Sequence, residues 1–433
     1  MTFSLSLIFM FLVFWRPQDW LIPQLQGWPI LDAVVLLALM TLLVEVDGKQ
    51  LRMPKKSPQV WLFIGLWIAT LFSHLANTYW GGFTDTLEKS FKFSLFGILL
   101  ITATDRSDRL RRVAFLFVGM ALFMTLHGWL QVKRGYGFGH YQPLVHLRPL
   151  TGETVCRSRF YGIFGDPNDL AQVLAVAIPF TFVLFRRINA FSILKSCALS
   201  GLLVAGMMTT HSRGGLVALT VAVPLTISAF MRPIWQKLAL CGLGIGWLLM
   251  LPLSGRLMDA SASDRVIFWG AANDAFKARP LFGVGYGLIW EYTDDRAVHN
   301  AFLTCSAELG FFGYWHWFGL IVASFLGLMY VSRTLKTRKD GETRYLRVYA
   351  GMVRASLGAY LASSFFLSRA YAWPFFFLVG IAAALPLVVS RTQMEDAWIP
   401  EYEASRFLVR NTVASLGSVL YIYACIRLIH AFS

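Results

Sequence analysis

The sequence predicts an all-α fold: a polytopic transmembrane helical bundle of about 12–13 spans, with a short helical loop outside the membrane. The first observation is composition, because 56% of the 433 residues are hydrophobic and only 15% are charged, against roughly 25% charged in an ordinary soluble domain. The second is that apolar runs recur at lengths close to the ~20 residues that a spanning helix needs. Together they exclude a soluble globular protein, a disordered chain, a collagen and a coiled coil.

Apolar runs along the chain are candidate spans, and we interpret the N-terminal run as a membrane helix rather than a signal peptide. It lacks a basic start, and the polar segment 16–20 follows it instead of a small-residue cleavage site. The last run is the least apolar of the set. In chain order the predicted spans are 2–15, 28–46, 59–77, 91–104, 113–131, 169–185, 196–210, 214–230, 238–252, 301–331, 348–367, 374–390 and 411–429.

The distribution of Lys and Arg orients these spans, because cytoplasmic loops are enriched in basic residues. With the N-terminus inside, 22 of the 39 basic residues fall in predicted cytoplasmic loops, and no loop breaks the alternation. We interpret 1–433 as a single integral membrane domain, with an external loop at 132–168 and a larger one at 253–300. The predicted cytoplasmic loops are 47–58, 105–112, 186–195, 231–237, 332–347 and 391–410.

The external side should be poor in cations, yet 15 of the 39 basic residues are predicted to lie there. Arginine held at an outer membrane face against the usual bias suggests an anionic ligand, and its planar fork suits phosphate especially well. The predicted external basic residues are Arg16, Lys89, Lys92, Lys133, Arg134, Arg148, Arg157, Arg159, Arg213, Arg256, Arg265, Lys277, Arg279, Arg296 and Arg369.

Two short motifs combine a turn with a cation. Gly-Asp-Pro-Asn at 165–168 is typical of a turn that starts a helix, in which Asp166 and Asn168 can cap the helix that follows. Arg159 precedes it, close to that helix N-terminus, where anions are favoured. Arg213 lies in the tight turn 210–215 between two apolar runs, where a charge is costly unless it is paired or used. The alternative for Arg213 is snorkelling to external headgroups.

The loop 253–300 contains a predicted helix. It starts at 261–264 with a possible capping box and ends near Ala278, before Arg279-Pro280. Arg265, Trp269, Ala272 and Phe276 share one face by helical spacing, so Arg265 can stack on the Trp269 indole and still face a ligand. The glycine-rich segment 281–287, which includes Tyr286, follows. No strand precedes it, so it indicates a flexible turn rather than a nucleotide site.

Polar residues open and interrupt the next apolar run. His299 and Asn300 lie at its outer end, and the unperturbed pKa of histidine lets His299 act as a base. Glu308 lies two turns further in, where a carboxylate is costly, and pairing with an arginine is the alternative to a chemical role. The five cysteines form no CxxC or Cys/His pattern, so neither a metal nor another cofactor is expected.

In this order the motifs resemble the bacterial O-antigen ligase and O-antigen polymerase superfamily. The resemblance covers roughly residues 155–320 and rests on Gly165-Asp166-Pro167-Asn168, Ser212-Arg213-Gly214, Arg265 with Trp269, Pro280-Leu281-Phe282-Gly283-Val284-Gly285, His299-Asn300 and Glu308-Leu309-Gly310. It implies a multi-pass glycosyltransferase of the bacterial inner membrane, in polysaccharide or lipopolysaccharide biosynthesis, with its active site facing the periplasm. The glycan donor would be carried on undecaprenyl diphosphate, and the acceptor would be a glycan, lipid A–core or a protein.

The resemblance also implies roles for single residues: Arg213 and Arg265 hold the diphosphate, and His299 is the catalytic residue near the acceptor, without a metal. Arg159 joins the diphosphate group in our interpretation, and Asp166, Asn168, Trp269, Tyr286, Asn300 and Glu308 support the site. Charge grows on phosphate oxygens as the glycosidic bond breaks, and arginines stabilise it. The acceptor hydroxyl gains from a base, and direct attack on the anomeric carbon inverts its configuration. No nucleic-acid partner is expected.

Three alternatives remain at this stage. A polymerase that joins carrier-linked repeats would use the same site as a ligase. A flippase for lipid-linked sugars would be expected to show repeated halves and charges along a path across the membrane, whereas the cations outside the cytoplasmic loops gather on one face here. A structural scaffold or sensor gives no account of the external arginines.

Overall fold

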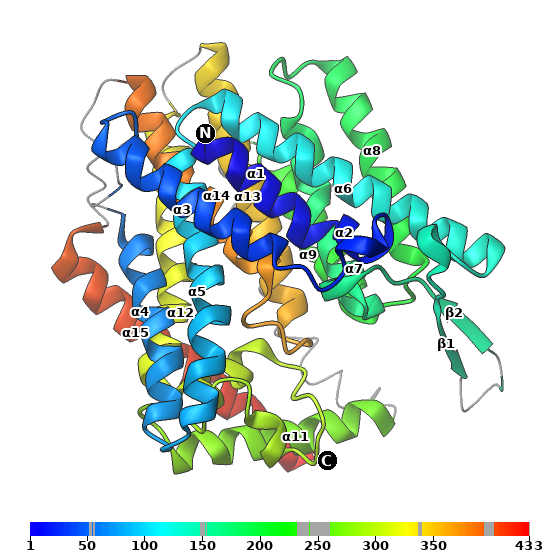
Figure 1. The fold of residues 1–433 in the computed structure, drawn as a ribbon, viewed down its shortest axis with the longest axis vertical. Coiled ribbons are helices and arrows are strands. Elements are labelled where there is room, and N and C mark those ends of the chain that lie inside the picture. Colours follow the sequence, from blue (N-terminus) through cyan, green and yellow to red (C-terminus); the bar gives the residue numbers. More distant parts are fainter. Residues whose placement is uncertain are drawn as a thin grey trace.

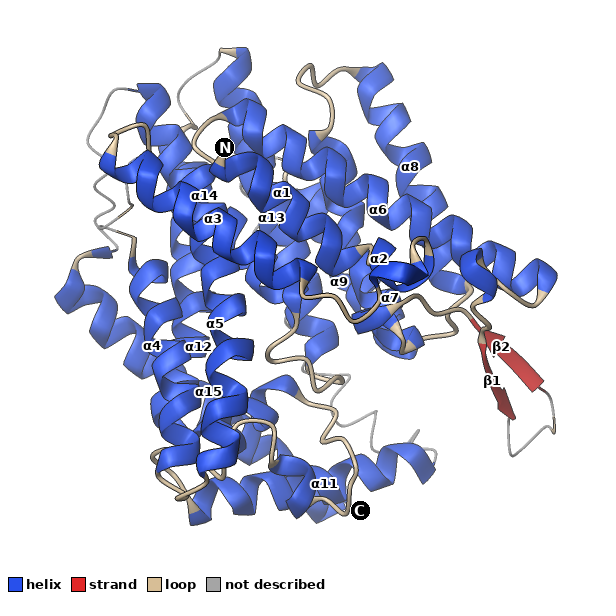
Figure 2. Cartoon of the chain, viewed as in Figure 1, coloured by secondary structure: helices blue, strands red, loops and turns tan. Residues whose placement is uncertain are grey.

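The computed structural model describes residues 1–51, 54, 57–147, 152, 154–231, 242, 260–336, 340–393 and 402–432. These residues form a helical bundle with one short β-hairpin (Figures 1 and 2). Apart from Gly242, the predicted span 238–252 lies outside the described residues, as do Arg148, Arg256 and the side chains of the predicted capping box at 261–264.

Helices make up nearly all of the described secondary structure. The α-helices are α1 (Thr2–Phe14), α2 (Pro17–Trp20), α3 (Ile30–Asp47), α4 (Pro58–Leu75), α5 (Trp80–Ala103), α6 (Ser107–Arg134), α7 (Pro167–Phe180), α8 (Ala190–Met208), α9 (Arg213–Ser228), α11 (Ala260–Ala278), α12 (Ala301–Thr334), α13 (Gly341–Ser364), α14 (Trp373–Gln393) and α15 (Ala404–Phe432). Short 3-10 turns are η1 (Pro23–Leu25), η2 (Phe138–His140), η3 (Gly162–Phe164), η4 (Thr181–Val183) and η5 (Ile289–Tyr292).

The expected all-α, polytopic fold is confirmed. Among the described residues, six helices are long and apolar enough to cross a membrane: α4, α6, α8, α12, α14 and α15. Three shorter apolar helices lie at 2–14, 167–183 and 213–228. The predicted spans 28–46, 91–104 and 348–367 correspond to α3, α5 and α13, which carry more polar residues. The span-like helices of the described residues are therefore fewer than the 12–13 runs that hydropathy alone suggests.

The core is built around α13, which packs against α7, α9, α12 and α14. Its tyrosines Tyr345, Tyr349 and Tyr360 are fully buried. Each places its hydroxyl on a backbone carbonyl of another segment, as buried tyrosines usually require: Tyr345 on Val183 at 2.9 Å, Tyr349 on Leu110 at 3.0 Å, and Tyr360 on Arg369 at 2.5 Å. The last of these bonds restrains the α13–α14 connection.

Ion pairs join several predicted cytoplasmic loops at one end of the bundle. Arg186 contacts Asp108 at 3.3 Å and Glu342 at 3.5 Å, and Arg391 contacts Asp105 at 3.2 Å. These residues come from four segments that the alternation of basic loops assigns to the same side. The N-terminus and the start of α6 lie at this end in Figure 1, and α11 lies at the opposite end.

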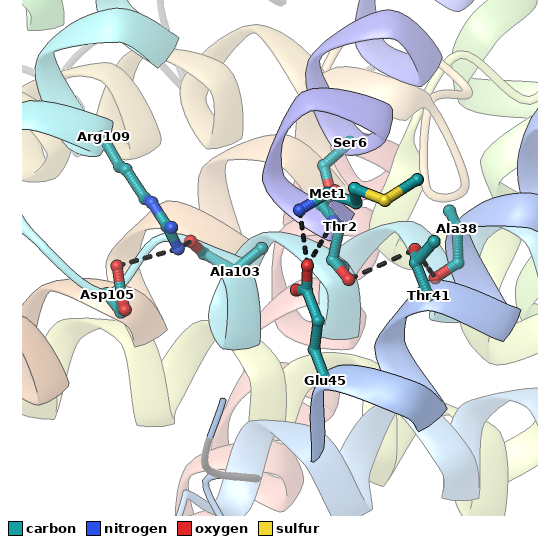
Figure 3. A network of polar contacts seen from close by, with 9 residues as sticks. All are labelled: Met1, Thr2, Ser6, Ala38, Thr41, Glu45, Ala103, Asp105 and Arg109. Carbon is teal, nitrogen blue, oxygen red and sulfur yellow. Dashed lines mark hydrogen bonds and ion pairs between the residues drawn. The ribbon is translucent and has the colours of Figure 1, made fainter. Parts of the chain in front are cut away.

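Figure 3 shows the polar contacts of this end at close range. The Met1 ammonium pairs with Glu45 at the end of α3. Arg109 pairs with Asp105 at 2.9 Å and donates to the Ala103 carbonyl at 2.8 Å, which closes the turn between α5 and α6. Contacts of charged groups therefore join the ends of four helices at this end of the bundle: α1 to α3, and α5 to α6.

The segment predicted as an external loop at 132–168 contains the hairpin. Strands β1 (Leu144–Leu147) and β2 (Thr154–Arg157) pair antiparallel, with Leu144 opposite Arg157. The sequence pattern did not predict these strands, because four residues give too short an alternation to recognise. The hairpin projects from the helical bundle (Figure 2).

Helix α12 is interrupted at Gly310, whose backbone has φ 62° and ψ −169°. The segment 280–285 lies against this break and exchanges four backbone hydrogen bonds of 2.7–3.1 Å with residues 307–312. A Cβ on Gly310 would lie 2.4 Å from the Leu281 backbone, and one on Gly283 would lie 2.2 Å from the Glu308 carbonyl oxygen. Two motifs that are separate in the sequence, 280–285 and 308–310, thus form one packed unit.

Candidate active site

Three motif residues begin three helices, which explains why short polar residues stand at these positions. Asp166 caps α7 and accepts from the Asn168 amide at 2.7 Å. Ser212 caps α9 and accepts from the Gly215 amide at 3.1 Å. Asn300 caps α12 with its side-chain oxygen. Each cap satisfies amide groups that a helix N-terminus leaves without partners.

Asn168 connects the first two motifs. Its side-chain oxygen accepts from the Ser212 hydroxyl at 2.7 Å and from the Arg157 guanidinium at 3.0 Å. Arg157 also donates to the Thr210 carbonyl at 2.9 Å. We predicted that both Asp166 and Asn168 could cap α7, but only Asp166 does so. Asn168 instead fixes the N-terminus of α9 against that of α7.

Arg213 and Arg265 come together from different elements. Arg213 is the first residue of α9 and is exposed, whereas Arg265 is half-buried on α11. Burial, and then the positive charge of Arg213, lower the pKa of Arg265. The Arg265 Nε is buried and has no hydrogen-bond partner among the described residues. Two like charges and an unused donor at one place favour an anionic ligand.

His299 interacts electrostatically with Arg265 and is hydrogen-bonded to the α13–α14 connection. Its backbone adopts a left-handed φ of 53°, and its amide donates to the Ser368 hydroxyl at 2.7 Å. Burial, Arg265 and Arg369 lower the pKa of His299, and Asp166 opposes them. The imidazole is therefore neutral at neutral pH, the form that can accept a proton.

The α11 helix matches its predicted bounds, and the predicted face is present. Trp269 and Ala272 are buried on it. The cation–π contacts of the described residues, however, do not pair Arg265 with Trp269. The indole instead donates to the Val298 carbonyl at 2.9 Å and meets Phe365 edge to face at 5.7 Å. Trp269 thus anchors the residue that precedes His299 and does not stack on the cation.

Tyr286 and Glu308 lie on the packed unit around the α12 break. Tyr286 packs against Tyr371 with ring centroids 4.7 Å apart. Glu308 is buried. No ion pair between it and an arginine is found in the described part of the chain, so the alternative of such a pairing is not observed. The amides of Gly287 and Ile289 and the Tyr371 hydroxyl face its carboxylate instead.

Arg159 contacts the segment that precedes β1. Its guanidinium lies 4.7 Å from the centre of the Tyr141 ring and donates to the Gln142 carbonyl at 3.0 Å. These contacts tie it to the segment before β1. The arginine of this region that reaches the α9 turn is Arg157, because β2 ends there and directs its side chain to Asn168.

The sequence interpretation missed one ion pair at the site. Arg369, from the α13–α14 connection, makes a two-pronged contact with the buried carboxylate of Asp169 on α7. Together with Ser368 they line a cavity of about 240 Å³. An available signal was the position of Asp169, a carboxylate at the start of an apolar run. Arg369 was recognised only as one external cation among fifteen.

The described residues contain no group of three or more His, Cys, Asp or Glu side chains that could hold a metal ion. A family model described as O-antigen ligase matches residues 198–318, a little over a quarter of the chain. This segment contains Arg213, Arg265 and His299. No curated protein matches the sequence. This match supports membership of the O-antigen ligase superfamily and an activity of the membrane glycosyltransferase type, as a ligase or a polymerase.

Proposed function

We propose that this protein transfers a glycan from an undecaprenyl diphosphate carrier to an acceptor hydroxyl on the periplasmic face of the inner membrane. The observation that carries the proposal is the meeting of Arg213 and Arg265, two cations from separate elements, beside the neutral imidazole of His299. A pair of guanidiniums suits a diphosphate group, and a neutral imidazole suits a hydroxyl group that must lose its proton.

Arg213 and Arg265 act as the diphosphate clamp in this scheme. As the bond between the anomeric carbon and the diphosphate oxygen breaks, its electron pair moves onto the leaving phosphate. Two guanidiniums placed there stabilise this charge, and Arg265 does so in a partly dehydrated setting where each interaction is stronger. The unpartnered Arg265 Nε is a donor available for a phosphate oxygen. Amides at the N-terminus of α9 add to the favourable field.

His299 acts as the general base. The imidazole takes the proton of the acceptor hydroxyl while that oxygen attacks the anomeric carbon, and the carrier diphosphate departs from the opposite face. This single displacement inverts the anomeric configuration. Burial, together with Arg265 and Arg369, lowers the pKa of His299 and so favours the proton-accepting form. Positioning comes from Ser368 at the His299 amide and from Trp269 at the preceding carbonyl.

Transfer by the purified full-length protein in detergent tests this function. The donor is the undecaprenyl diphosphate-linked glycan extracted from host membranes, and the product is followed by mass spectrometry. We expect His299→Ala to lower the rate by about 10²–10⁴, with comparable losses for Arg213→Ala and Arg265→Ala. Lys277→Gln, which removes an exposed cation from the same α11 helix, should leave the rate unchanged.

Two further readings of the same assay separate the alternatives. Transfer of a glycan to a non-carrier acceptor indicates a ligase, whereas growth of the chain on the carrier indicates a polymerase. Anomeric NMR of donor and product must show inversion. Normal turnover by a folded His299→Ala variant, retention of configuration, or no transfer by the pure protein would each contradict the proposal. The last outcome would favour a transporter.

A further inference from the structure

The cavity beside His299 is a second candidate site. Ser368 belongs to the cavity wall, and its hydroxyl also accepts a hydrogen bond of 2.7 Å from the His299 backbone amide. The cavity is therefore one residue away from His299. Arg369 lines the cavity too, and its charge acts on His299. The cavity wall also includes Phe93, Ile163, Phe164, Asp169, Gln172, Ala372 and Trp373.

Two charge centres with different partners act on His299. The first is Arg265, which feels the charge of Arg213 and has an unused donor. The second is Arg369, which is engaged by the buried carboxylate of Asp169. The first centre thus offers a buried donor at Arg265, whereas the guanidinium of the second centre is already paired with a carboxylate of the protein. An anion is therefore favoured on the Arg265 side and gains little on the Arg369 side.

The lining of the cavity has two kinds of surface. One part offers hydrogen-bonding groups: the Asp169 carboxylate, the Ser368 hydroxyl and the side-chain oxygen of Gln172, whose nitrogen is used by Ser363 and Ser364. Another part offers the Trp373 indole and other aromatic rings. A pyranose ring presents the complementary pattern, with hydroxyl groups at its rim and C–H groups on its faces.

We propose that this cavity binds an uncharged sugar ring of the acceptor, the ring that bears the attacking hydroxyl. The inference rests on the proposed function, because it places this ring opposite the diphosphate clamp with His299 between them. It adds that the acceptor is a neutral carbohydrate at the point of attack. A phosphate or carboxylate on that ring would meet Asp169 and would have to compete with it for Arg369.

Binding of simple glycosides tests the cavity without requiring turnover. The probes are methyl glucopyranoside, methyl galactopyranoside and methyl glucuronide, presented to the full-length protein in detergent and followed by saturation-transfer NMR. Ala372 lines the cavity, so Ala372→Phe fills space without removing a polar contact. We expect the signal of the neutral glycosides to fall at least fivefold. Ala190→Phe, the same change at an exposed position of α8, is the matched control and should bind normally.

The charge balance provides a second, independent variant. Asp169→Asn keeps the shape of the cavity and releases Arg369 from its carboxylate. We expect a reversal of preference, with methyl glucuronide bound at least fivefold better than the neutral methyl glucoside. Binding of glucuronide in preference to neutral glycosides by the unaltered protein would overturn the assignment, as would equal glycoside binding by Ala372→Phe and Ala190→Phe.

Kinetics distinguish this inference from the proposed function. Ala372→Phe should raise KM for the acceptor at least tenfold and leave KM for the lipid donor unchanged. A rise in donor KM alone would assign the cavity to the donor and refute the inference. His299→Ala should still bind the methyl glycosides, because the base is not part of the cavity wall. Glycoside binding together with full transfer by His299→Ala would retain the cavity and reject the base.

Discussion

Replacing Gly310 with alanine tests the packed unit at the break in α12. The backbone there combines φ 62° with ψ −169°, a region that is essentially restricted to glycine and costs another residue about 1–3 kcal/mol. The new Cβ would also lie 2.4 Å from the Leu281 backbone, far inside the ~3.5 Å of an ordinary contact. The backbone shifts that would make room for this Cβ cost a further 1–3 kcal/mol or so. We therefore expect about 2–6 kcal/mol of destabilisation in total.

Gly135 provides the control for the backbone effect. It has φ 80°, but no atom lies within 4 Å of a Cβ added there, so Gly135→Ala should cost only about 1–2 kcal/mol. Thermal unfolding of both variants in one detergent, followed by tryptophan fluorescence at one scan rate, compares the two losses. Transfer activity should fall for Gly310→Ala, because 280–285 leads into the loop that carries His299. Equal stability of the two variants would refute the packing described for this break.

Two other predictions concern the site. Arg369→Gln removes a cation that lowers the pKa of His299, so the acidic limb of the pH–rate profile should move to higher pH, since the proposed base must be neutral to accept a proton. Arg296→Gln, at an exposed position of the loop that carries His299, should leave the acidic limb in place. An acidic limb that stays fixed in both variants would contradict the assignment. Asn168→Ala should lower the free energy of unfolding by about 1–3 kcal/mol, because the Ser212 hydroxyl and the Arg157 guanidinium lose their acceptor. Thermal unfolding measures this loss. A double-mutant cycle with Ser212→Ala should give a coupling of about 0.5–3 kcal/mol, and strict additivity would argue against the 2.7 Å bond between them.

Local signals in the sequence predicted local structure well. The α11 helix was expected from 261–264 to about Ala278 and spans Ala260–Ala278, because Arg279-Pro280 provides a stop and the apolar face is regular. Asp166 was expected to cap the next helix and does so. Both features depend on neighbouring residues only, so short-range rules are sufficient for them.

Features that depend on distant residues were not predicted. The carboxylate of Asp169 and the guanidinium of Arg369 are 200 residues apart in the chain, and no local pattern pairs them. The start of α5 at Trp80 was placed at 91, because hydropathy detects only the apolar part of a helix that continues into polar sequence. The expectation that Arg265 can stack on Trp269 is not met. The indole instead donates to the Val298 carbonyl and packs edge to face against Phe365, two contacts that helical spacing does not reveal.

The left-handed backbone of His299 sets stability against the chemistry that we propose for this residue. A non-glycine residue in that conformation costs roughly 1–2 kcal/mol, and the Ser368 bond to its amide holds it there. Glycine at this position would relieve the cost, so selection for thermal stability alone would favour removing the imidazole. A stability-optimised version of the chain would therefore drift toward an inactive one here, unless position 299 were held fixed during selection.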